Sequence, residues 1–246
     1  VGELSAMNAI AGSYAENIPV IHIVGVPTTN NIENKTLLHH NFQHPDYYAF
    51  EKAFEPVVES TAFLTKENAK SEIDRIINVF KTTKRPVYLA IPMDITELEI
   101  DSMQEVKTVQ SDKKNLDEFI DKATAMINAS KSPVIIGDTL IKRFLAEDEY
   151  RTFAEKTCIP ASNLLMGAGI IDFDTPNYLG TFLGKFGNET AYKYLTETDC
   201  AIFVGPIYSD LNSFGFALPY KPDEQIAIYG TYSIINNQIY ENIYMN

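Results

Sequence analysis

The sequence predicts an α/β fold in which parallel sheets are flanked by helices, and two observations carry this prediction. Short apolar runs rich in β-branched residues recur along the chain, as at 20–26 and 133–138. Stretches with apolar residues at helical spacing separate these runs, as at 65–81 and 115–129. Strands that alternate with helices form parallel sheets, and helices cover both faces of such sheets. We therefore expect two domains, each built around a parallel sheet.

Residues 1–95 are predicted to form the first domain. In chain order we expect a helix over 3–16, a strand over 20–26, a helix over 46–57, a helix from about 65 to 81 and a strand over 85–92. Pro19 stops the first helix, because proline lacks a backbone donor and clashes with the preceding turn. The run 20–26 is β-branched except for His22 and Gly25, which is typical of a strand that is buried on both faces.

Residues 96–114 are predicted to be a linker, since they carry many charges and no large apolar cluster. The second domain is predicted at 115–246. In chain order we expect a helix over 115–129, a strand over 133–138, a helix over 146–156, a short edge strand over 159–163, a helix over 189–195 and strands over 200–205 and 225–229.

The composition excludes several classes of function. With 33 acidic and 20 basic side chains and a net charge of -13, the chain lacks the positive surface that nucleic acid requires. No apolar run reaches the roughly 20 residues of a membrane-spanning helix, and the first residues do not resemble a signal peptide. We therefore expect a cytoplasmic protein with no nucleic-acid or membrane partner. The two cysteines, Cys158 and Cys200, have no Cys-x-x-Cys spacing and are predicted to be buried structural thiols.

An adjacent pair of histidines, His39 and His40, is the strongest candidate for chemistry. The pair makes up half of the four histidines, closes a short apolar stretch and precedes a polar, aromatic loop at 41–48. Imidazoles can bind an anion and transfer protons near neutral pH. The residues alone leave a second interpretation open, in which both side chains are simply solvated.

Three further ionisable residues are interpreted as structural. His22 lies inside an apolar strand and is expected to be a hydrogen-bonded core residue rather than a ligand. Glu3 and Glu16 lie at the two ends of the first predicted helix and could form an acid–base pair. A glutamate near a helix start is better explained by the helix dipole, so we assign both glutamates to structure or to an interface.

Ordered motifs along the chain carry a specific resemblance. They are Val-Gly-Glu-Leu-Ser-Ala-x-Asn-x-Ile-Ala-Gly-Ser-Tyr-Ala-Glu at 1–16, His-Ile-Val-Gly-Val-Pro at 22–27, Leu-Leu-His-His at 37–40 and Arg-Pro-Val-Tyr-Leu-x-Ile-Pro at 85–92, with weaker matches at 131–136 and 166–169. In these motifs the chain resembles the pyruvate and indolepyruvate decarboxylases, which are thiamine-diphosphate-dependent 2-oxo-acid decarboxylases.

The resemblance implies a domain organisation. Family members have a pyrimidine-binding domain, a Rossmann-like middle domain and a third domain that binds diphosphate and Mg²⁺. This chain resembles the C-terminal part of the first domain and nearly all of the middle one. The family's cofactor-polarising glutamate and its Gly-Asp-Gly metal motif have no counterpart here, and Val1 is not an initiator methionine. We therefore expect a fragment that is inactive alone, and we assign no cofactor-binding or metal-binding residue within it.

The resemblance also implies an activity for the full-length enzyme. It would convert a 2-oxo acid, such as pyruvate or indolepyruvate, to an aldehyde and CO2 with thiamine diphosphate and Mg²⁺, as a homodimer or homotetramer. By resemblance, His39 and His40 lie at the substrate end of the site, where they bind the carboxylate and relay protons.

Some positions depart from the family pattern. His44 lies where the family usually has a Gly-rich loop, which leaves pocket shape and substrate size open. Asn17 and Leu140 stand where the allosterically activated yeast-type members have a histidine and a cysteine, so we expect no thiol-mediated activation relay.

Two alternatives from other classes are kept. One is a non-catalytic α/β module that binds a nucleotide or a partner, although the segment 167–169 lacks the third glycine of a dinucleotide fingerprint. The other is a carboligating synthase of the same superfamily, which the adjacent histidine pair disfavours.

Overall fold

The computed structural model describes residues 1–39, 41–100, 109–218 and 222–245. The chain divides into two compact units, Val1–Thr108 and Val109–Asn246, and each is described by itself. Of the predicted linker at 96–114, residues 101–108 lie outside the described residues. His40, one of the two predicted catalytic histidines, also lies outside them.

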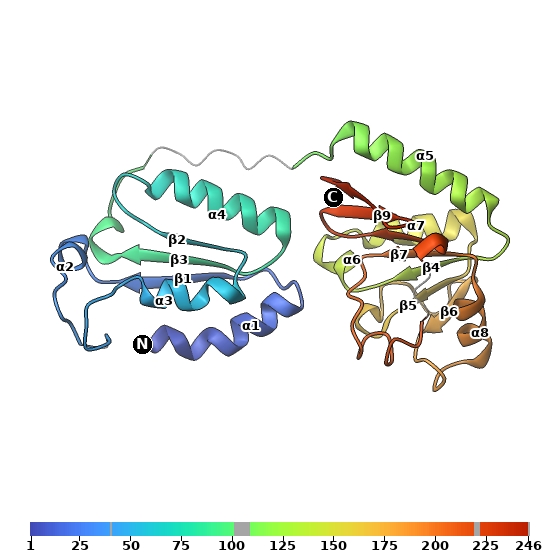
Figure 1. The fold of residues 1–246 in the computed structure, drawn as a ribbon, viewed down its shortest axis with the longest axis horizontal. Helices are drawn as coiled ribbons and strands as arrows, with labels where there is room; N and C mark the ends of the chain where they lie inside the picture. The colour runs from blue at the N-terminus through green and yellow to red at the C-terminus, as the bar shows by residue number, and fades with distance from the viewer. Residues whose placement is uncertain (40, 101–108, 219–221, 246) are drawn as a thin grey trace. The chain divides into compact units, whose positions relative to one another are not determined.

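The first unit is a three-stranded parallel sheet with helices on both faces (Figure 1). Its elements in chain order are η1 (Gly2–Ala6), α1 (Met7–Ala15), β1 (Ile21–Val26), α2 (Thr29–Glu33), α3 (Ala49–Phe54), η2 (Glu55–Val57), β2 (Ser60–Phe63), α4 (Ala69–Thr83), β3 (Val87–Pro92) and η3 (Met93–Ile95). The strand order is β1-β3-β2, so β3 is the central strand.

An apolar core lies on each face of this sheet. α4 covers one face with Ile73, Ile76 and Phe80, which recur at the spacing of one helical stripe. α1 and α3 cover the other face, where Ile10 and Phe54 are buried. The two helical layers hold the strands in place, and the loops at the strand ends stay accessible.

The structure corrects two predictions for the first unit. β1 is not covered on both faces, because it is an edge strand and α4 packs over β2 and β3; Ile23 is 60% exposed as a result. The helix expected over 3–16 starts as the 3-10 turn η1, and α1 ends at Ala15. The pattern also gave no sign of α2, which is short and mostly polar, or of β2, which has four residues of which two are polar.

The second unit is a seven-stranded sheet with the order β10-β9-β8-β7-β4-β5-β6. Its elements are α5 (Lys113–Ala129), β4 (Pro133–Gly137), α6 (Leu140–Arg143), α7 (Glu147–Thr157), β5 (Ala161–Asn163), η4 (Leu165–Gly167), β6 (Tyr178–Thr181), α8 (Glu189–Glu197), β7 (Cys200–Val204), η5 (Pro222–Glu224), β8 (Gln225–Ile228), β9 (Tyr232–Ile235) and β10 (Gln238–Glu241). The strands β4 to β8 are parallel, and β9 and β10 extend the sheet in antiparallel fashion.

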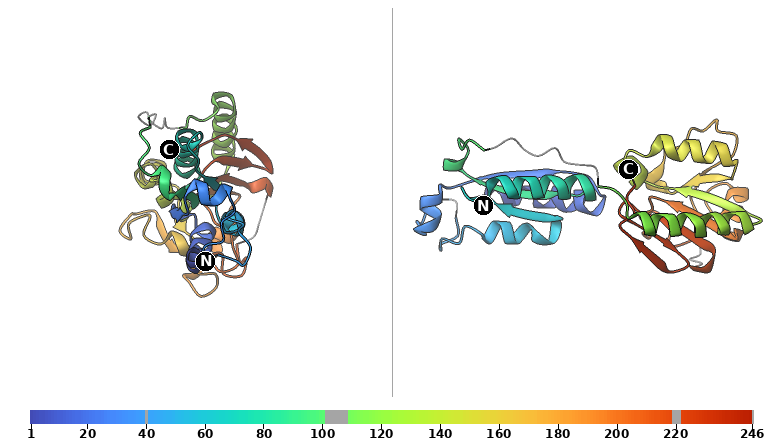
Figure 2. Two further views of the ribbon diagram at one scale, coloured as in Figure 1. Left: turned by 90° about the vertical axis from the view of Figure 1, so that its left-hand side faces the viewer. Right: turned by 90° about the horizontal axis from the view of Figure 1, so that it is seen from above.

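Helices flank both faces of this sheet as well (Figure 2). Phe119 of α5 and Ala154 of α7 share one core with Ile135 of β4. Leu195 of α8 shares the opposite core with Ile136, the next residue of β4. Both isoleucines are fully buried, as expected for a central strand of a parallel sheet. The predicted α/β class, with parallel sheets flanked by helices, is confirmed.

Two predictions for the second unit are wrong. The strand predicted at the sheet edge over 159–163 is an interior one, because β6 pairs with β5 on its outer side. Cys158 is exposed at the C-cap of α7, where its φ is 54°, whereas Cys200 is buried in β7 as predicted. Both cysteines are free thiols. Over the described residues, no helix is both long and apolar enough to cross a membrane.

Candidate functional site

The carboxyl ends of the three parallel strands in the first unit meet at one edge of the sheet. β1 ends at Val26, β2 at Phe63 and β3 at Pro92. Ligands of open α/β sheets bind outside this edge, because the loops that follow the strands converge there. The loop after β1 contains α2 and then residues 37–46, which include His39 and which we call the histidine segment. This segment therefore follows the carboxyl edge of the sheet (Figure 1).

A cavity of about 340 Å³ opens at this edge of the sheet. Thr29 and Asn30 of α2 line one side, and Lys66 and Glu67, which precede α4, line the other. The ring of Tyr48 also lines the cavity. The wall therefore offers hydroxyl, amide and charged groups together with an aromatic face.

Asp94 fixes the start of α2 at this cavity. Its Oδ1 accepts a hydrogen bond from the backbone amide of Thr29 at 2.8 Å, and its Oδ2 accepts one from the Thr29 hydroxyl at 2.6 Å. These hydrogen bonds to the ionised form lower the pKa of Asp94. The carboxylate therefore joins the turn after β3 to the helix that lines the cavity.

The loop after β2 is fixed by a reciprocal pair of hydrogen bonds. The amide of Thr65 donates to Asn68 Oδ1 at 2.6 Å, and the amide of Asn68 donates to Thr65 Oγ1 at 3.2 Å. Asn68 Nδ2 also donates to the carbonyl oxygen of Phe63 at 3.1 Å. Lys66 and Glu67 are thus carried on a defined turn.

The chain leaves α2 through a Schellman motif that leads into the histidine segment. Lys35 has a φ of 49°, and its amide donates to the carbonyl oxygen of Ile32 at 3.2 Å. The amide of Thr36 donates to the carbonyl oxygen of Asn31 at 3.0 Å. These are the two hydrogen bonds that define the motif. The carbonyl oxygen of Thr36 accepts a further hydrogen bond from the hydroxyl of Tyr47.

His39 lies in an exposed turn of this segment, three residues after Thr36. Oδ1 of Asn41, two residues after His39, accepts a hydrogen bond from the amide of Phe42 at 2.9 Å. Its Nδ2 is buried and makes no hydrogen bond within the described residues. Phe42 then packs on Phe50 of α3, with ring centroids 4.9 Å apart. An imidazole and an unused amide donor therefore lie two positions apart in the chain.

A second cavity, of about 440 Å³, adjoins the histidine segment. Lys35 and His44 line it with their basic side chains, and Tyr47 and Tyr48 line it with aromatic rings. It shares Tyr48 with the first cavity. The second cavity therefore borders the histidine segment at His44, whereas the first cavity has no lining residue in that segment, and His39 lines neither cavity.

The structure assigns His22 and Glu3 to packing. His22 lies against the rings of Phe54 and Tyr88, at centroid distances of 4.8 and 5.5 Å. Burial lowers its pKa, and the nearby charge of Glu3 opposes that shift. Glu3 accepts a hydrogen bond from the hydroxyl of Tyr88 at 2.7 Å, and Glu16 is the C-cap residue of α1. His22 was expected to be hydrogen-bonded, and this is wrong for its Nε2 atom. Within the described residues Nε2 has no hydrogen-bond partner, because the imidazole packs against the rings of Phe54 and Tyr88.

The corresponding edge of the second unit is built around Asp138, a fully buried residue that follows β4. Its Oδ2 accepts hydrogen bonds at 2.7 Å from the amide of Ile207 and from Asn212 Nδ2. Burial raises the pKa of Asp138, and these hydrogen bonds oppose that shift. Asn212 Oδ1 in turn accepts from the amide of Met166 at 2.8 Å. The carboxylate thus joins the loops that follow two strands.

The glycines of this edge allow close packing of protein against protein. A Cβ on Gly167 would lie 2.7 Å from the Cα of Asp138, and one on Gly205, whose φ is 63°, would lie 2.7 Å from the amide nitrogen of Ile141. The segment around Gly167 is a 3-10 turn rather than a glycine-rich loop that opens a long helix. It therefore lacks the geometry of a dinucleotide-binding turn.

Within the described residues, no group of three or more histidine, cysteine, aspartate or glutamate side chains could hold a metal ion. Glu33 and Glu67, which line the first cavity, therefore belong to no such group.

Several site residues were missed from the sequence, although a signal existed for two of them. Thr29 and Asp94 each follow a predicted strand within three residues, and the ends of parallel strands converge. Tyr47 and Tyr48 both fall where the predicted polar loop over 41–48 overlaps the predicted helix over 46–57, and neither was predicted to be a site residue. Their places beside the cavities depend on how the loop folds back, which has no sequence period.

Comparisons with known proteins agree with this architecture. A family model described as the central domain of thiamine pyrophosphate enzymes matches residues 120–242. The chain is 32% identical to the pyruvate decarboxylase of Kluyveromyces lactis and 32% identical to pyruvate decarboxylase isozyme 1 of Saccharomyces cerevisiae. The pyruvate decarboxylase of Hanseniaspora uvarum is 30% identical. Each alignment covers 100% of this chain but only 44 to 45% of the relative. The chain therefore spans less than half the length of the curated relatives that it matches.

Proposed function

Because this chain belongs to the thiamine-diphosphate-dependent enzymes of the pyruvate decarboxylase family, we propose that the complete protein decarboxylates a 2-oxo acid without oxidation. The bond between the carbonyl carbon and the carboxylate carbon breaks, and CO2 leaves. A proton takes the place of CO2 on the carbonyl carbon, which gives an aldehyde. One proton is consumed in each turnover, and no oxidant is needed.

The observation that carries the proposal is the place of the histidine segment. It starts from the carboxyl edge of a parallel sheet, where ligands of this fold class bind, and the second cavity borders it at His44. His39 is exposed there, so a substrate can reach its imidazole.

We propose that His39 and His40 bind the substrate carboxylate and supply the proton that replaces CO2. Imidazole is suited to this task because it accepts and releases protons near neutral pH. The buried Nδ2 of Asn41 is a donor that lacks a partner within the described residues, and an anion would satisfy it. The Lys35 side chain adds positive charge at the second cavity, which the Asp46 carboxylate also lines.

The cofactor of this family is thiamine diphosphate, and Mg²⁺ is its usual partner metal. When bound, the cofactor supplies the electron sink for decarboxylation. The described residues do not fit the metal, since they contain no group of three ligating side chains. We propose that residues 1–246 do not turn over substrate alone.

We propose that the complete protein acts as a homodimer or homotetramer in the cytoplasm. It takes a small 2-oxo acid and has no nucleic-acid or membrane partner. Pyruvate, indolepyruvate, phenylpyruvate and branched 2-oxo acids are the candidate substrates. His44 and the two tyrosines of the second cavity are the described residues that would influence substrate size.

The test is to supply the complete enzyme with this panel of 2-oxo acids and to measure CO2 and aldehyde together. We expect equal amounts of both products from at least one acid. CO2 with a 2-hydroxyketone as the main product would favour the carboligating alternative. No CO2 from any of the acids would overturn the proposal and favour a binding module.

A further inference from the structure

A hydrogen bond of Tyr47 connects the two ends of the segment that carries His39. Its hydroxyl donates to the carbonyl oxygen of Thr36, 11 positions earlier in the chain. The Tyr47 side chain is 6% exposed, so its ring is held by packing while the hydroxyl makes this bond. Residues 37–46, the histidine segment, lie between the two partners and form a loop that we call the histidine loop from here on.

The acceptor of this hydrogen bond is held from its other side as well. The amide of Thr36 donates to the carbonyl oxygen of Asn31, so Thr36 is part of the C-terminal motif of α2. α2 itself is joined through Thr29 to Asp94, which follows β3. The start of the histidine loop is therefore connected to the sheet through a continuous set of hydrogen bonds.

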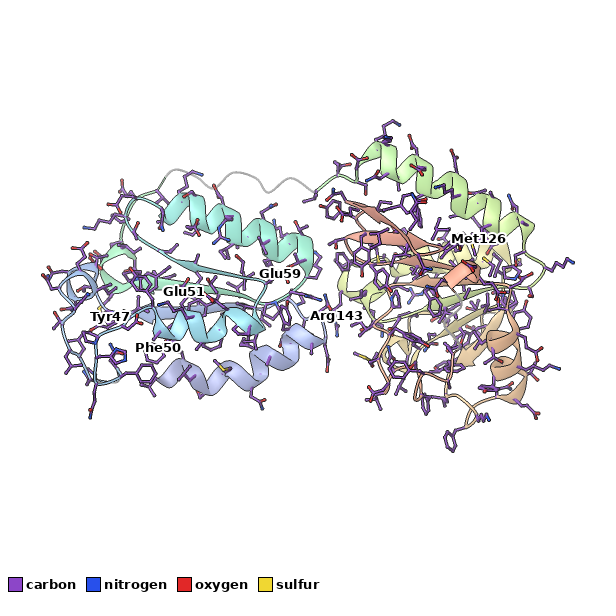
Figure 3. The ribbon with its side chains drawn as sticks, viewed as in Figure 1. Tyr47, Phe50, Glu51, Glu59, Met126 and Arg143 are labelled. Atoms are coloured by element: carbon purple, nitrogen blue, oxygen red, sulfur yellow. The ribbon has the colours of Figure 1, made fainter. Side chains whose placement is uncertain are left out.

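The donor is held by the turn that opens α3. Oδ1 of Asp46 accepts a hydrogen bond from the amide of Tyr48 at 3.1 Å, and Oδ2 of Asp46 lies 3.8 Å from Nζ of Lys52. Tyr47 lies between Asp46 and Tyr48 in the sequence, two residues before α3 begins at Ala49 (Figure 3). Its hydroxyl thus joins a fixed turn at the end of the loop to a fixed residue at its start.

A second contact holds the middle of the histidine loop. Phe42 packs on Phe50, which is 7% exposed and lies in the first turn of α3. His39 is therefore on a short stretch between two held points, Thr36 and Phe42. Without the Tyr47 hydroxyl, the stretch would lose the first of these two contacts and keep the second.

From this arrangement we propose that Tyr47 is a positioning residue: its hydroxyl, through the Thr36 carbonyl, sets the position of His39 toward the substrate. This inference rests on the proposed decarboxylase function. It adds a residue that touches neither substrate nor cofactor and acts through the loop. A reacting group that is displaced by about 1 Å can lose about 10²-fold in rate. Because the Phe42 contact remains, we expect a smaller loss when only the hydroxyl is removed.

The experiment is Tyr47→Phe in the complete enzyme, which removes one hydroxyl and keeps the ring. The matched control is Tyr14→Phe. Tyr14 also uses its hydroxyl in one side-chain hydrogen bond, which it accepts from Arg85 at 3.0 Å. Arg85 precedes β3, so this bond lies at the opposite edge of the same sheet. The readouts are kcat, KM and the pH profile of kcat/KM, with the unfolding temperature measured alongside.

We expect Tyr47→Phe to lower kcat about 3- to 30-fold and to raise KM by a smaller factor, because His39 is proposed to contact the bound carboxylate as well, while transition-state geometry is affected more than binding. The pH profile of kcat/KM should shift, since a displaced imidazole titrates in a different environment. Tyr14→Phe should change none of these values. Wild-type kcat and pH profile in Tyr47→Phe would overturn the inference, as would equal losses in both variants.

The failure of this inference can be told apart from the failure of the proposed function. If Tyr47→Phe behaves as wild type while His39→Ala is slow, the loop works without the Tyr47 hydroxyl and the proposed function stands. If alanine at His39 and at His40 leaves turnover unchanged, the proposed function itself fails, and Tyr47 has nothing to position.

Discussion

Asp94 accepts two hydrogen bonds from Thr29, one from the backbone amide at 2.8 Å and one from the hydroxyl at 2.6 Å. The two residues are 65 positions apart, and each follows a strand of the same parallel sheet. Their contact fixes α2, which lines the first cavity and leads into the histidine loop. The site thus depends on a carboxylate that takes no part in the proposed chemistry.

Replacing Asp94 should loosen the start of α2. Asp94→Ala removes both acceptors, whereas Asp94→Asn keeps one carbonyl oxygen, so we expect stability in the order wild type, Asp94→Asn, Asp94→Ala. The amide of Thr29 should exchange with solvent fastest in Asp94→Ala. Hydrogen exchange measured residue by residue checks this, and an unchanged Thr29 rate in Asp94→Ala would contradict it.

The Asp94 contact should also depend on pH. The hydrogen bonds from Thr29 lower the pKa of Asp94 below its usual 3.8. The ionised form is therefore the one that stabilises the fold, and its contribution is complete above the unfolded pKa. It is lost as the pH falls through the lowered pKa. The Thr29 amide should accordingly become less protected in wild type at acid pH, and this change should be smaller in Asp94→Asn.

His22 should make the first unit less stable as the pH falls below about 6.5, its ordinary pKa. Burial between Phe54 and Tyr88 lowers the pKa of His22, so the unfolded chain takes up a proton before the folded chain does. Stability is complete above pH 6.5 and declines from there toward the lowered pKa. His22→Phe should flatten this slope in urea unfolding measured across the range. Equal slopes in wild type and His22→Phe would contradict the account.

The two isoleucines Ile76 and Ile23 test the assignment of faces in the first unit. Ile76 of α4 is fully buried, so Ile76→Ala should cost about 2 to 5 kcal/mol of unfolding free energy. Ile23 of β1 is 60% exposed, so Ile23→Ala should cost about 0.5 kcal/mol or less. Urea unfolding of both variants measures the difference. Similar losses would show that β1 is covered in solution.

Asp138 should be a determinant of stability in the second unit. Asp138→Ala removes the side-chain acceptor of the Ile207 amide and one of two acceptors of Asn212 Nδ2, which also donates to the carbonyl oxygen of Ile207, at a cost of about 1 to 3 kcal/mol. Asp138→Asn keeps an acceptor oxygen and should cost less. Hydrogen exchange should show the loss in residues of the second unit and leave the first unit unchanged. A loss shared by both units would contradict this assignment.

The sequence was sufficient for the central strands and long helices. β3, β4 and β7 are apolar and β-branched because helices cover them on both faces, and that pattern is visible in the chain. α4 and α5 are long enough for their apolar stripes to recur several times. These elements give the α/β class directly.

The sequence did not predict features that depend on which strands lie beside one another in the folded sheet. β2 and β6 are four residues each and only partly buried, so their pairing with β3 and β5 forms them. Ile23 carries the same apolar signal as a buried residue, yet its exposure follows from the place of β1 at an edge. A usable signal was overlooked at Asn236 and Asn237, whose positive φ values form the turn between β9 and β10.

The site was predictable only in part for the same reason. His39 stands out by residue type and by the motifs around it. The bond from Tyr47 to Thr36 joins a side chain to a backbone carbonyl, and any residue at 36 supplies that carbonyl. Such contacts leave no trace in composition or periodicity, so they emerge only from the folded loop.

The most direct test of the account is the turnover of His39→Ala and His40→Ala in the complete enzyme, with the preferred 2-oxo acid at saturation. General acid–base groups contribute about 10²- to 10⁴-fold, so we predict that each variant loses at least about tenfold in kcat while its unfolding temperature stays near that of wild type. Wild-type turnover in both variants would contradict the claim that the histidine loop carries the chemistry of this site.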